Sequence, residues 1–288
     1  MTQNTLSRRS FVAVAAMAPL AFSLRAAGSI PVGLELYSVR KALKQDPMGT
    51  VRAVAAMGYQ CVEFYAPYFD WTEGQTKEMR KLLDDLGIHC YSTHNDSSYF
   101  AADKLSRASD MNHTLGCRYM VMSSAGGEAY AEGAGLDPWK TVAETLNHTA
   151  AYLAPQNLKT GYHNHQFEFT PQNGTRPIEI LAKNTDPKSV MLQLDVGTCI
   201  EAGSDPVAWI RSNPGRIRSL HLKEWSPEPG KGYTVLFGEG VAKWKGILEA
   251  AESVGGVEYY LIEQEGSRFS ELDTAKKCLE SYQALRHG

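Results

Sequence analysis

The 288-residue sequence lacks the features that mark nucleic-acid-binding proteins, disulfide scaffolds and membrane-spanning proteins. Its formal net charge is −3, so it has no basic surplus to bind DNA, RNA or an acidic membrane surface. Its five cysteines are an odd number without motif spacing, which predicts mostly buried thiols. Beyond the N-terminal segment, no apolar run reaches the ~20 residues that a membrane-spanning helix needs.

The N-terminus carries a candidate export signal. The pair Arg8–Arg9 precedes the weakly apolar run VAVAAMAPLAF, and the small residues Ala26–Ala27 follow. This order is typical of a secretory signal, and adjacent arginines resemble the twin-arginine type. The alternative is a basic N-terminus before a buried helix. We expect a cleavable twin-arginine signal peptide over residues 1–27, a mature catalytic domain over residues 28–288, and a periplasmic location.

Apolar runs alternate with amphipathic segments from Ile30 onward. The apolar runs are PVGLELYSV, QCVEFYA, IHCYSTH, RYMVMSS, LKTGYHNH, SVMLQLDVG, RIRSLHLKE and VEYYLIEQE. Helices are expected over residues 47–57, 76–86, 101–115, 138–153, 177–184, 206–212, 241–254 and 272–285. Eight strand–helix units in ~250 residues predict a single α/β domain, a (β/α)8 barrel. An open doubly wound sheet is the alternative, but it usually has a glycine-rich loop where this chain has YSVRKALK.

Helix ends carry local signals. Aspartate precedes proline at three expected helix starts, Asp46, Asp137 and Asp205, which predicts aspartate N-caps. Glycine follows three expected helices, at Gly58, Gly87 and Gly116, as is common at helix C-termini.

Ionisable residues end the last four predicted strands, and a barrel places its active site at the carboxyl ends of its strands. These residues are His163, Asp195, His221 and Glu263. Buried carboxylates are costly unless they are paired or bind a metal. A mixed nitrogen and oxygen set suits Mn²⁺, Fe²⁺, Co²⁺ or Zn²⁺ better than Ca²⁺ or a thiolate-bound metal. We expect one divalent ion here, Mn²⁺ first, with Zn²⁺, Fe²⁺, Co²⁺ or Mg²⁺ as alternatives.

The segment GYHNHQFEF offers two histidines, His163 and His165, and the sequence leaves open which one is the first ligand. Residues two apart on a strand share a face, so both can reach the barrel axis. The candidate acid or base residues are Glu263, His165, Glu265 and Lys223, and the candidate substrate contacts are His94, Glu63, Glu168 and Trp225. Each has a structural alternative, such as a hydrogen-bonded core histidine or a packed tryptophan. Trp71, Trp139 and Tyr68 could likewise stack on a sugar ring at the rim of the pocket, or they could pack in the protein interior.

Four motifs, YHNHQFEF, LDVG, HLKE and LFGEG…W…EQE, follow one another over nearly all of the mature chain. They resemble the xylose-isomerase-like sugar isomerase/epimerase family of TIM barrels. The resemblance to relatives of the tagatose-epimerase and inosose-dehydratase type implies a divalent metal held by an acid, an aspartate, a histidine and a glutamate. The last three match Asp195, His221 and Glu263. The first falls near His163, where many relatives have glutamate.

This departure affects the implied mechanism. Epimerases of that type use two metal-bound glutamates as proton shuttles, and the chain does not supply the first of them. His165, His94 or Lys223 would have to replace one arm of the shuttle.

These observations predict a metal-dependent isomerase or epimerase that acts through an enediolate on a non-phosphorylated carbohydrate. One alternative is a lyase, hydratase or hydrolase that acts on 3-keto-glycosides through the same enolate. An alternative of another class is a non-catalytic periplasmic carbohydrate-binding barrel. The net charge of −3 argues against a nuclease resembling endonuclease IV. We expect no nucleic-acid partner, no membrane association after signal cleavage, and a possible homodimer.

Overall fold

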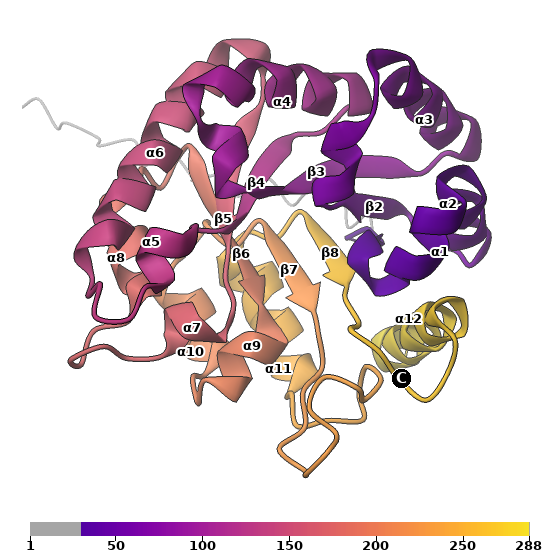
Figure 1. Ribbon diagram of the computed structural model, residues 1–288. Coiled ribbons are helices and arrows are strands. Elements are labelled where there is room, and N and C mark those ends of the chain that lie inside the picture. The colour runs from indigo at the N-terminus through magenta and orange to yellow at the C-terminus, as the bar shows by residue number, and fades with distance from the viewer. Residues whose placement is uncertain (1–29, 288) are drawn as a thin grey trace, which may run out of the picture.

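The computed structural model describes residues 30–287, so the expected export signal lies outside the described residues. Eight parallel strands close into a barrel in chain order (Figure 1), which confirms the predicted (β/α)8 fold. The strands are β1 (Val32–Glu35), β2 (Cys61–Phe64), β3 (His89–Asp96), β4 (Tyr119–Ser124), β5 (Lys159–His163), β6 (Val190–Asp195), β7 (Ser219–Leu222) and β8 (Tyr259–Ile262). Each strand pairs with the next, and β8 pairs with β1.

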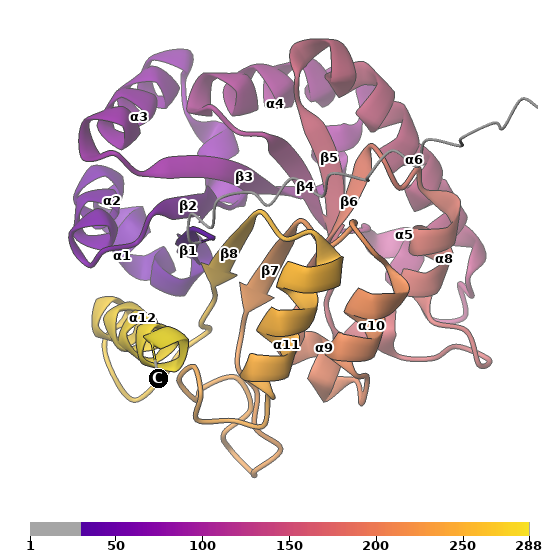
Figure 2. The ribbon, with the colours of Figure 1, turned by 180° about the vertical axis from the view of Figure 1, so that it is seen from behind.

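The helices surround the strands, as Figures 1 and 2 show from opposite sides. They are α1 (Arg40–Gln45), α2 (Pro47–Ala56), α3 (Glu73–Leu86), α4 (Ala102–Leu115), α5 (Gly127–Tyr130), α6 (Asp137–Leu153), α7 (Gln166–Phe169), α8 (Pro177–Asn184), α9 (Val196–Glu201), α10 (Pro206–Ser212), α11 (Trp244–Ala250) and α12 (Glu271–His287). Short turns are η1 (Leu36–Val39), η2 (Ala66–Asp70), η3 (Ser97–Phe100), η4 (Ala154–Gln156) and the π-helical η5 (Ala251–Gly255).

All strands run in one direction, so their carboxyl ends form one end of the barrel, the mouth, and their amino ends form the base. The helices between strands return the chain from mouth to base. The last helix, α12, does the same, and Arg286 near its end pairs with Glu252 in η5 at 2.6 Å. The described chain therefore both enters and leaves the fold at the base.

Local signals set most helix boundaries. The Asp46 and Asp205 side chains accept backbone N–H groups in the first turns of α2 and α10. Gly87 and Gly116 end α3 and α4 with left-handed φ values of 66° and 80°. The N-cap prediction for Asp137 is wrong, because α6 begins at Asp137 itself and its carboxylate lies in the first turn.

The interior of the barrel changes from apolar to polar along the strands. A separate apolar cluster consists of Cys61, Tyr119, Val121, Met191, Tyr259 and Leu261. Side chains alternate along a strand, so residues two or four positions later point to the same side. Glu63 follows Cys61 in this way, Gln193 and Asp195 follow Met191, and Glu263 follows Leu261. The apolar cluster fills the interior near the base, and polar groups fill it toward the mouth.

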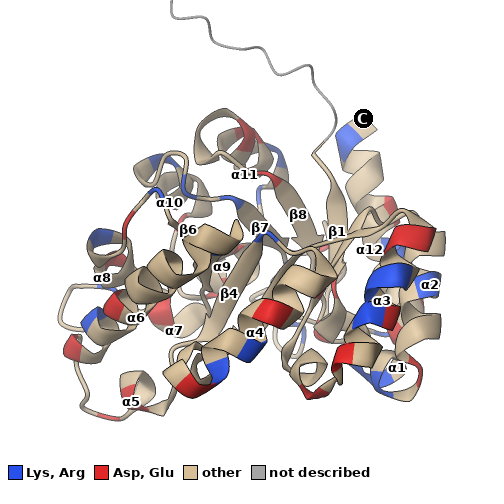
Figure 3. Ribbon diagram, turned by 90° about the horizontal axis from the view of Figure 1, so that it is seen from above, with Lys and Arg blue, Asp and Glu red and all other residues tan. Residues whose placement is uncertain are grey.

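Surface charges of both signs are interspersed on α3 and α4 in the view of Figure 3. On α3, the pairs Lys77–Glu73, Arg80–Asp84 and Lys81–Asp85 bridge successive turns. No helix among residues 30–287 is both long and apolar enough to span a bilayer. All five cysteines are buried free thiols, as predicted.

Candidate metal centre

Three of the four predicted metal ligands meet near the mouth of the barrel. One donor atom from each of His163, Asp195 and Glu263 lies within 4.8 Å of the other two. His163 ends β5, Asp195 ends β6 and Glu263 directly follows β8, and all three are buried. His221 in β7 is also buried, and its Nδ1 lies 2.6 Å from Oε2 of Glu263. The four side chains therefore converge, with His221 joined to the group through Glu263.

Asp195 has the contact pattern of a metal ligand. Its Oδ1 accepts a hydrogen bond of 3.0 Å from the backbone N–H of Thr198, in the first turn of α9. Its Oδ2 is buried and has no hydrogen-bond partner, an unfavourable state for a carboxylate oxygen. His163 Nε2 lies 3.9 Å and Lys223 Nζ 3.5 Å from this oxygen. A divalent cation would satisfy it, so the donor set fits a metal.

Glu63 holds His221 from the base side. Its Oε1 lies 2.9 Å from Nε2 of His221 and 3.0 Å from Nε2 of His94. Its Oε2 accepts hydrogen bonds from the Gln193 amide and the Ser92 hydroxyl. With Nε2–H of His221 directed at Glu63, Nδ1 is left to bind a metal, as in carboxylate–histidine–metal arrangements. Both Glu63 oxygens have protein partners, so Glu63 can orient His221, and its contact with substrate stays a prediction.

Gln193 orients His163 in the same way. Its Oε1 lies 3.1 Å from Nδ1 of His163 and 2.7 Å from Nε2 of His94, which leaves Nε2 of His163 facing Asp195. The sequence analysis missed Gln193. Its signal was a polar residue two positions before Asp195 in an otherwise apolar strand.

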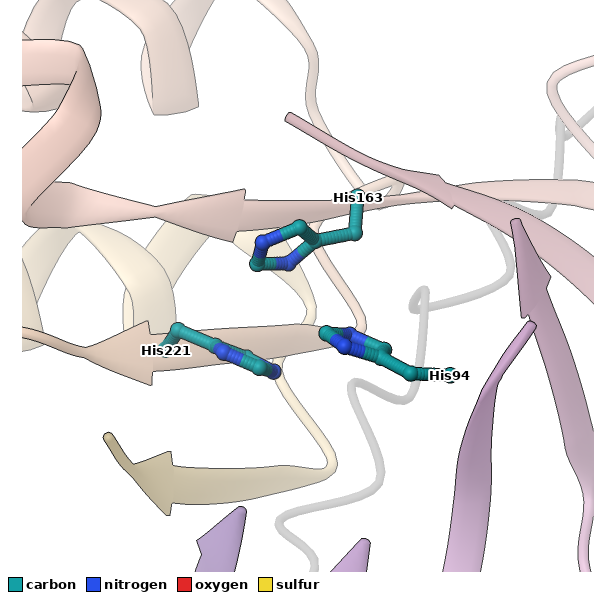
Figure 4. Close-up of side chains that lie close together, drawn as sticks. All are labelled: His94, His163 and His221. Atoms are coloured by element: carbon teal, nitrogen blue, oxygen red, sulfur yellow. The ribbon is translucent and has the colours of Figure 1, made fainter. Parts of the chain in front are cut away.

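The rings of His94, His163 and His221 face one another (Figure 4), and one nitrogen from each lies within 4.8 Å of the others. These three histidines could hold an ion themselves. However, Nε2 of both His94 and His221 points at Oε1 of Glu63. The three histidines, here called the inner group, are therefore better explained as hydrogen-bonded support for the candidate ligands His163, Asp195 and Glu263.

The electrostatics of the site favour a cation. Burial and the nearby His221 charge hold the pKa of His163 well below its usual value, so its ring is neutral with a free lone pair. Burial alone would lower the pKa of His221, but hydrogen bonds with Glu263 and Glu63 raise it to about 10. Burial would raise the pKa of Glu263, but Lys223 and His221 lower it. Without a metal, a proton on His221 compensates these carboxylates, and that proton must leave when Nδ1 binds a metal.

We expect metal affinity to rise with pH at every pH below about 10, with release of about one proton per ion bound near neutral pH. The pKa of His221 is raised from 6.5 to about 10, so its contribution to the stability of the metal-free protein is full below pH 6.5. That contribution disappears as the pH rises through 10. Calorimetric titration of metal in buffers of different ionisation enthalpy measures the released proton. An affinity independent of pH would contradict the assignment of His221.

Substitution Glu63→Gln is expected to weaken metal binding about 10- to 100-fold, the usual cost of losing a group that orients a ligand. The measurement is the metal dissociation constant, with competition by a chelator. The matched control is Ser92→Ala, which removes a different partner of Glu63 and keeps the contact between Glu63 and His221. Equal losses in the two variants would show that Glu63 acts only through general packing.

Lys223 lies among the carboxylates of the site. Its Nζ is 3.2 Å from Oε1 of Glu263 and 3.5 Å from Oδ2 of Asp195, and it donates a hydrogen bond to Glu265. Lys223 has only 2% of its side chain exposed, whereas Glu265 has 41%. Tyr233 lies in the loop between β7 and α11, and its ring centroid is 4.6 Å from Nζ of Lys223. The sequence analysis did not single out Tyr233. Glu265 is therefore the carboxylate of this group that solvent reaches.

His165 lies beside the ligand group rather than within it. Strand β5 ends at His163, so the alternation that would bring His165 to the same face stops there. The His165 ring packs edge-on against His163, with centroids 5.0 Å apart, and is partly exposed. This geometry favours His163 over His165 as the candidate ligand and leaves His165 as a candidate acid or base at the mouth.

The remaining predicted substrate contacts have structural partners. The buried Glu168 carboxylate accepts hydrogen bonds of 2.7 Å from the Tyr130 and Tyr162 hydroxyls. It also accepts one of 2.8 Å from the backbone N–H of His165. Glu168 therefore holds the loop that carries His165, and its contact with substrate stays a prediction. Trp225 is half-buried, and its backbone N–H donates to Glu224. His94 remains at the edge of the site, with 10% of its side chain exposed.

The sequence also matches a known protein family. A sequence model of the xylose isomerase-like TIM barrel family matches residues 51–286. The chain belongs to this family. Two solved structures illustrate the range of the likeness. A sugar phosphate isomerase/epimerase from Parabacteroides distasonis ATCC 8503 is 26% identical with a TM-score of 0.73, covering 93% of this chain and 98% of that one.

The second structure, the IOLI protein with a bound zinc atom, has a TM-score of 0.64 and covers 88% of this chain and 95% of that one. Its 15% identity shows the shared fold alone. Among curated proteins, the inosose dehydratase of Clostridium tetani (strain Massachusetts / E88) is 34% identical over 88 residues, 31% of this chain. The matched segment spans only 29% of the length of that relative.

Proposed function

We propose that this protein is a metal-dependent isomerase or epimerase of a non-phosphorylated carbohydrate, exported to the periplasm. The observation that carries the proposal is the buried Oδ2 of Asp195, which has no hydrogen-bond partner and faces His163 and Lys223. The names of related proteins, which include a sugar phosphate isomerase/epimerase and inosose dehydratases, support a small carbohydrate as substrate. The donor set fits Mn²⁺ first, with Zn²⁺, Fe²⁺, Co²⁺ or Mg²⁺ as alternatives.

The residues that would hold the ion are His163 through Nε2, His221 through Nδ1, and the carboxylates of Asp195 and Glu263. When bound, the ion supplies Lewis-acid polarisation of a carbonyl and its neighbouring hydroxyl. Glu265, which is exposed and hydrogen-bonded to Lys223, removes the proton from the adjacent carbon to give the enediolate. Lys223 keeps that carboxylate in place and offers a hydrogen bond to a substrate oxygen.

His165 supplies the second proton-transfer group. It follows β5, whereas Glu265 follows β8, and these strands are not neighbours in the barrel. The two groups can therefore approach a bound sugar from different directions. Return of the proton to the neighbouring carbon gives isomerisation, and return to the opposite face of the original carbon gives epimerisation.

The test is deuterium incorporation from heavy water into candidate sugars by metal-loaded protein, followed by NMR. We expect exchange at the carbon next to the carbonyl in at least one sugar, and loss of that exchange after chelation. Absence of exchange in free sugars and in 3-keto-glycosides at full metal loading would refute the proposal. Fractionation of cells and N-terminal sequencing of the mature protein would test export and cleavage near Gly28.

The inosose dehydratase relatives favour one second candidate, a lyase or hydratase that uses the same proton abstraction. In that case the enolate expels a substituent from the next carbon, and NMR shows an unsaturated product in place of an isomer. A non-catalytic binding barrel would instead keep its sugar affinity after the metal is removed, with no exchange at all.

A further inference from the structure

A groove of about 430 Å³ lies beside the metal centre, between the segment after β1 and the loop that joins β8 to α12. Its volume falls within the ~300–1,000 Å³ that is usual for small-molecule sites. Its lining includes Ser38, Arg40, Ala42 and Gln45 on one side, with Glu265 and Ser267 on the other.

The two walls of the groove are joined by hydrogen bonds, so the groove is a fixed feature of the fold. The backbone N–H of Gln264 donates to Oγ of Ser38 at 2.9 Å. The Arg40 guanidinium donates to the carbonyl of Glu265 at 2.9 Å. At the outer end, the N–H of Lys41 donates to the carboxylate of Glu271 at 3.0 Å.

Glu265 connects the groove to the metal centre. It lines the groove, and its carboxylate pairs with Lys223, which also contacts Asp195 and Glu263. The Glu265 carbonyl accepts from Arg40 in the groove while its carboxylate pairs with Lys223, so this one residue lies between the groove and the metal centre. A molecule of two joined units could therefore place one unit in the groove and the other at the metal centre.

The charge of the groove favours a neutral occupant. Arg40 and Lys41 are balanced by Glu265 and Glu271, and both carboxylates accept hydrogen bonds from protein groups. A phosphate dianion would lie near these carboxylates and be repelled. The hydroxyl groups of a sugar can donate to carboxylates and carbonyls and accept from hydroxyl and guanidinium groups.

We propose that this groove is a second subsite, which holds a neutral sugar unit or another hydroxylated group joined to the reacting unit. The substrate class is then a glycoside of two units rather than a free monosaccharide. The position of the reacting unit rests on the proposed function, whereas binding in the groove does not.

The experiment compares the binding of glucose with that of cellobiose, maltose and trehalose to zinc-loaded protein, by calorimetry and saturation-transfer NMR. The variants Ala42→Trp and Gln45→Trp fill the groove from one wall. The matched control Ser106→Trp places the same side chain in a separate cavity lined by residues of α3 and α4. Circular dichroism and thermal unfolding confirm that each variant is folded.

We expect at least one disaccharide to bind at least tenfold more tightly than glucose. This preference should disappear in a folded groove variant and persist in Ser106→Trp. Equal affinities for glucose and all disaccharides, no binding of any sugar, or an unchanged preference in both groove variants would overturn the proposal. If the binding pattern holds but no sugar derivative shows deuterium exchange, the proposed function fails and the subsite remains.

Discussion

Substitution Asp195→Asn is expected to remove the bound metal and the activity together. Asparagine keeps the shape of the side chain but replaces the unpartnered Oδ2 carboxylate oxygen and its charge. Loss of a group that merely orients a ligand costs about 10- to 100-fold in metal affinity, so loss of this ligand should cost ~100-fold or more. The measurements are metal content by mass spectrometry and the rate of deuterium exchange at saturating substrate.

The matched control is Asp205→Asn. Asp195 and Asp205 each accept a backbone N–H at the start of a helix, so both changes alter a helix N-cap. Asp205 is exposed, and its variant should keep metal and activity within about twofold. Unchanged metal content in Asp195→Asn would move the metal to the inner group of His94, His163 and His221.

Substitution Lys223→Met should destabilise the metal-free protein by about 3–5 kcal/mol, the range for removing one partner from a buried ion pair. Without the ammonium group, the carboxylates of Asp195 and Glu263 are left facing each other. The expected fall in melting temperature is roughly 6–20 °C for a domain of this size. Added divalent metal should restore most of the loss, because the ion then supplies the missing positive charge.

Thermal unfolding with chelator and with saturating metal measures both effects. Lys159→Met is the control, since Lys159 also lies over a tyrosine ring, Tyr119 at 5.7 Å, but is exposed. Its variant should unfold within a few degrees of the natural protein under both conditions. An equal loss of stability with and without metal in Lys223→Met would mean that packing, not charge, explains Lys223.

Most of the fold could be predicted from the sequence because each strand–helix unit carries its own period and boundary signals. Helices α8 and α10 match the predicted ranges 177–184 and 206–212. The first strand was predicted too long, because η1 begins directly after Glu35 and places Tyr37 outside the sheet. The helix predicted over 241–254 begins later, at Trp244, and ends in the π-helical turn η5.

The positions of the candidate ligands could also be predicted, because parallel strands bring their carboxyl ends together whatever the loops do. The groups that hold those ligands could not be predicted, since their contacts join residues far apart in the chain. Glu63 contacts His221 across 158 positions. Trp139 and Tyr68, which were candidate rim aromatics, are buried in the core instead.

The conformation of the long loop between β7 and α11 could not be predicted from the sequence either. Its conformation depends on the buried carboxylate of Glu224, which accepts hydrogen bonds from the N–H groups of Gly238 and Ala242 and from the Trp244 indole. That loop carries Tyr233 to Lys223. No periodic signal in the sequence reports a contact of this kind.

Both ends of the described chain leave the barrel at its base, where Arg286 of α12 pairs with Glu252. A resin, electrode or fusion partner attached at residue 30 or residue 287, the ends of the described chain, would consequently be held at the face opposite the mouth. The orientation of an immobilised sample is thus determined by its topology, and diffusion of soluble sugars to the mouth would remain unobstructed. Immobilisation through an engineered cysteine near Glu265 would reverse this geometry.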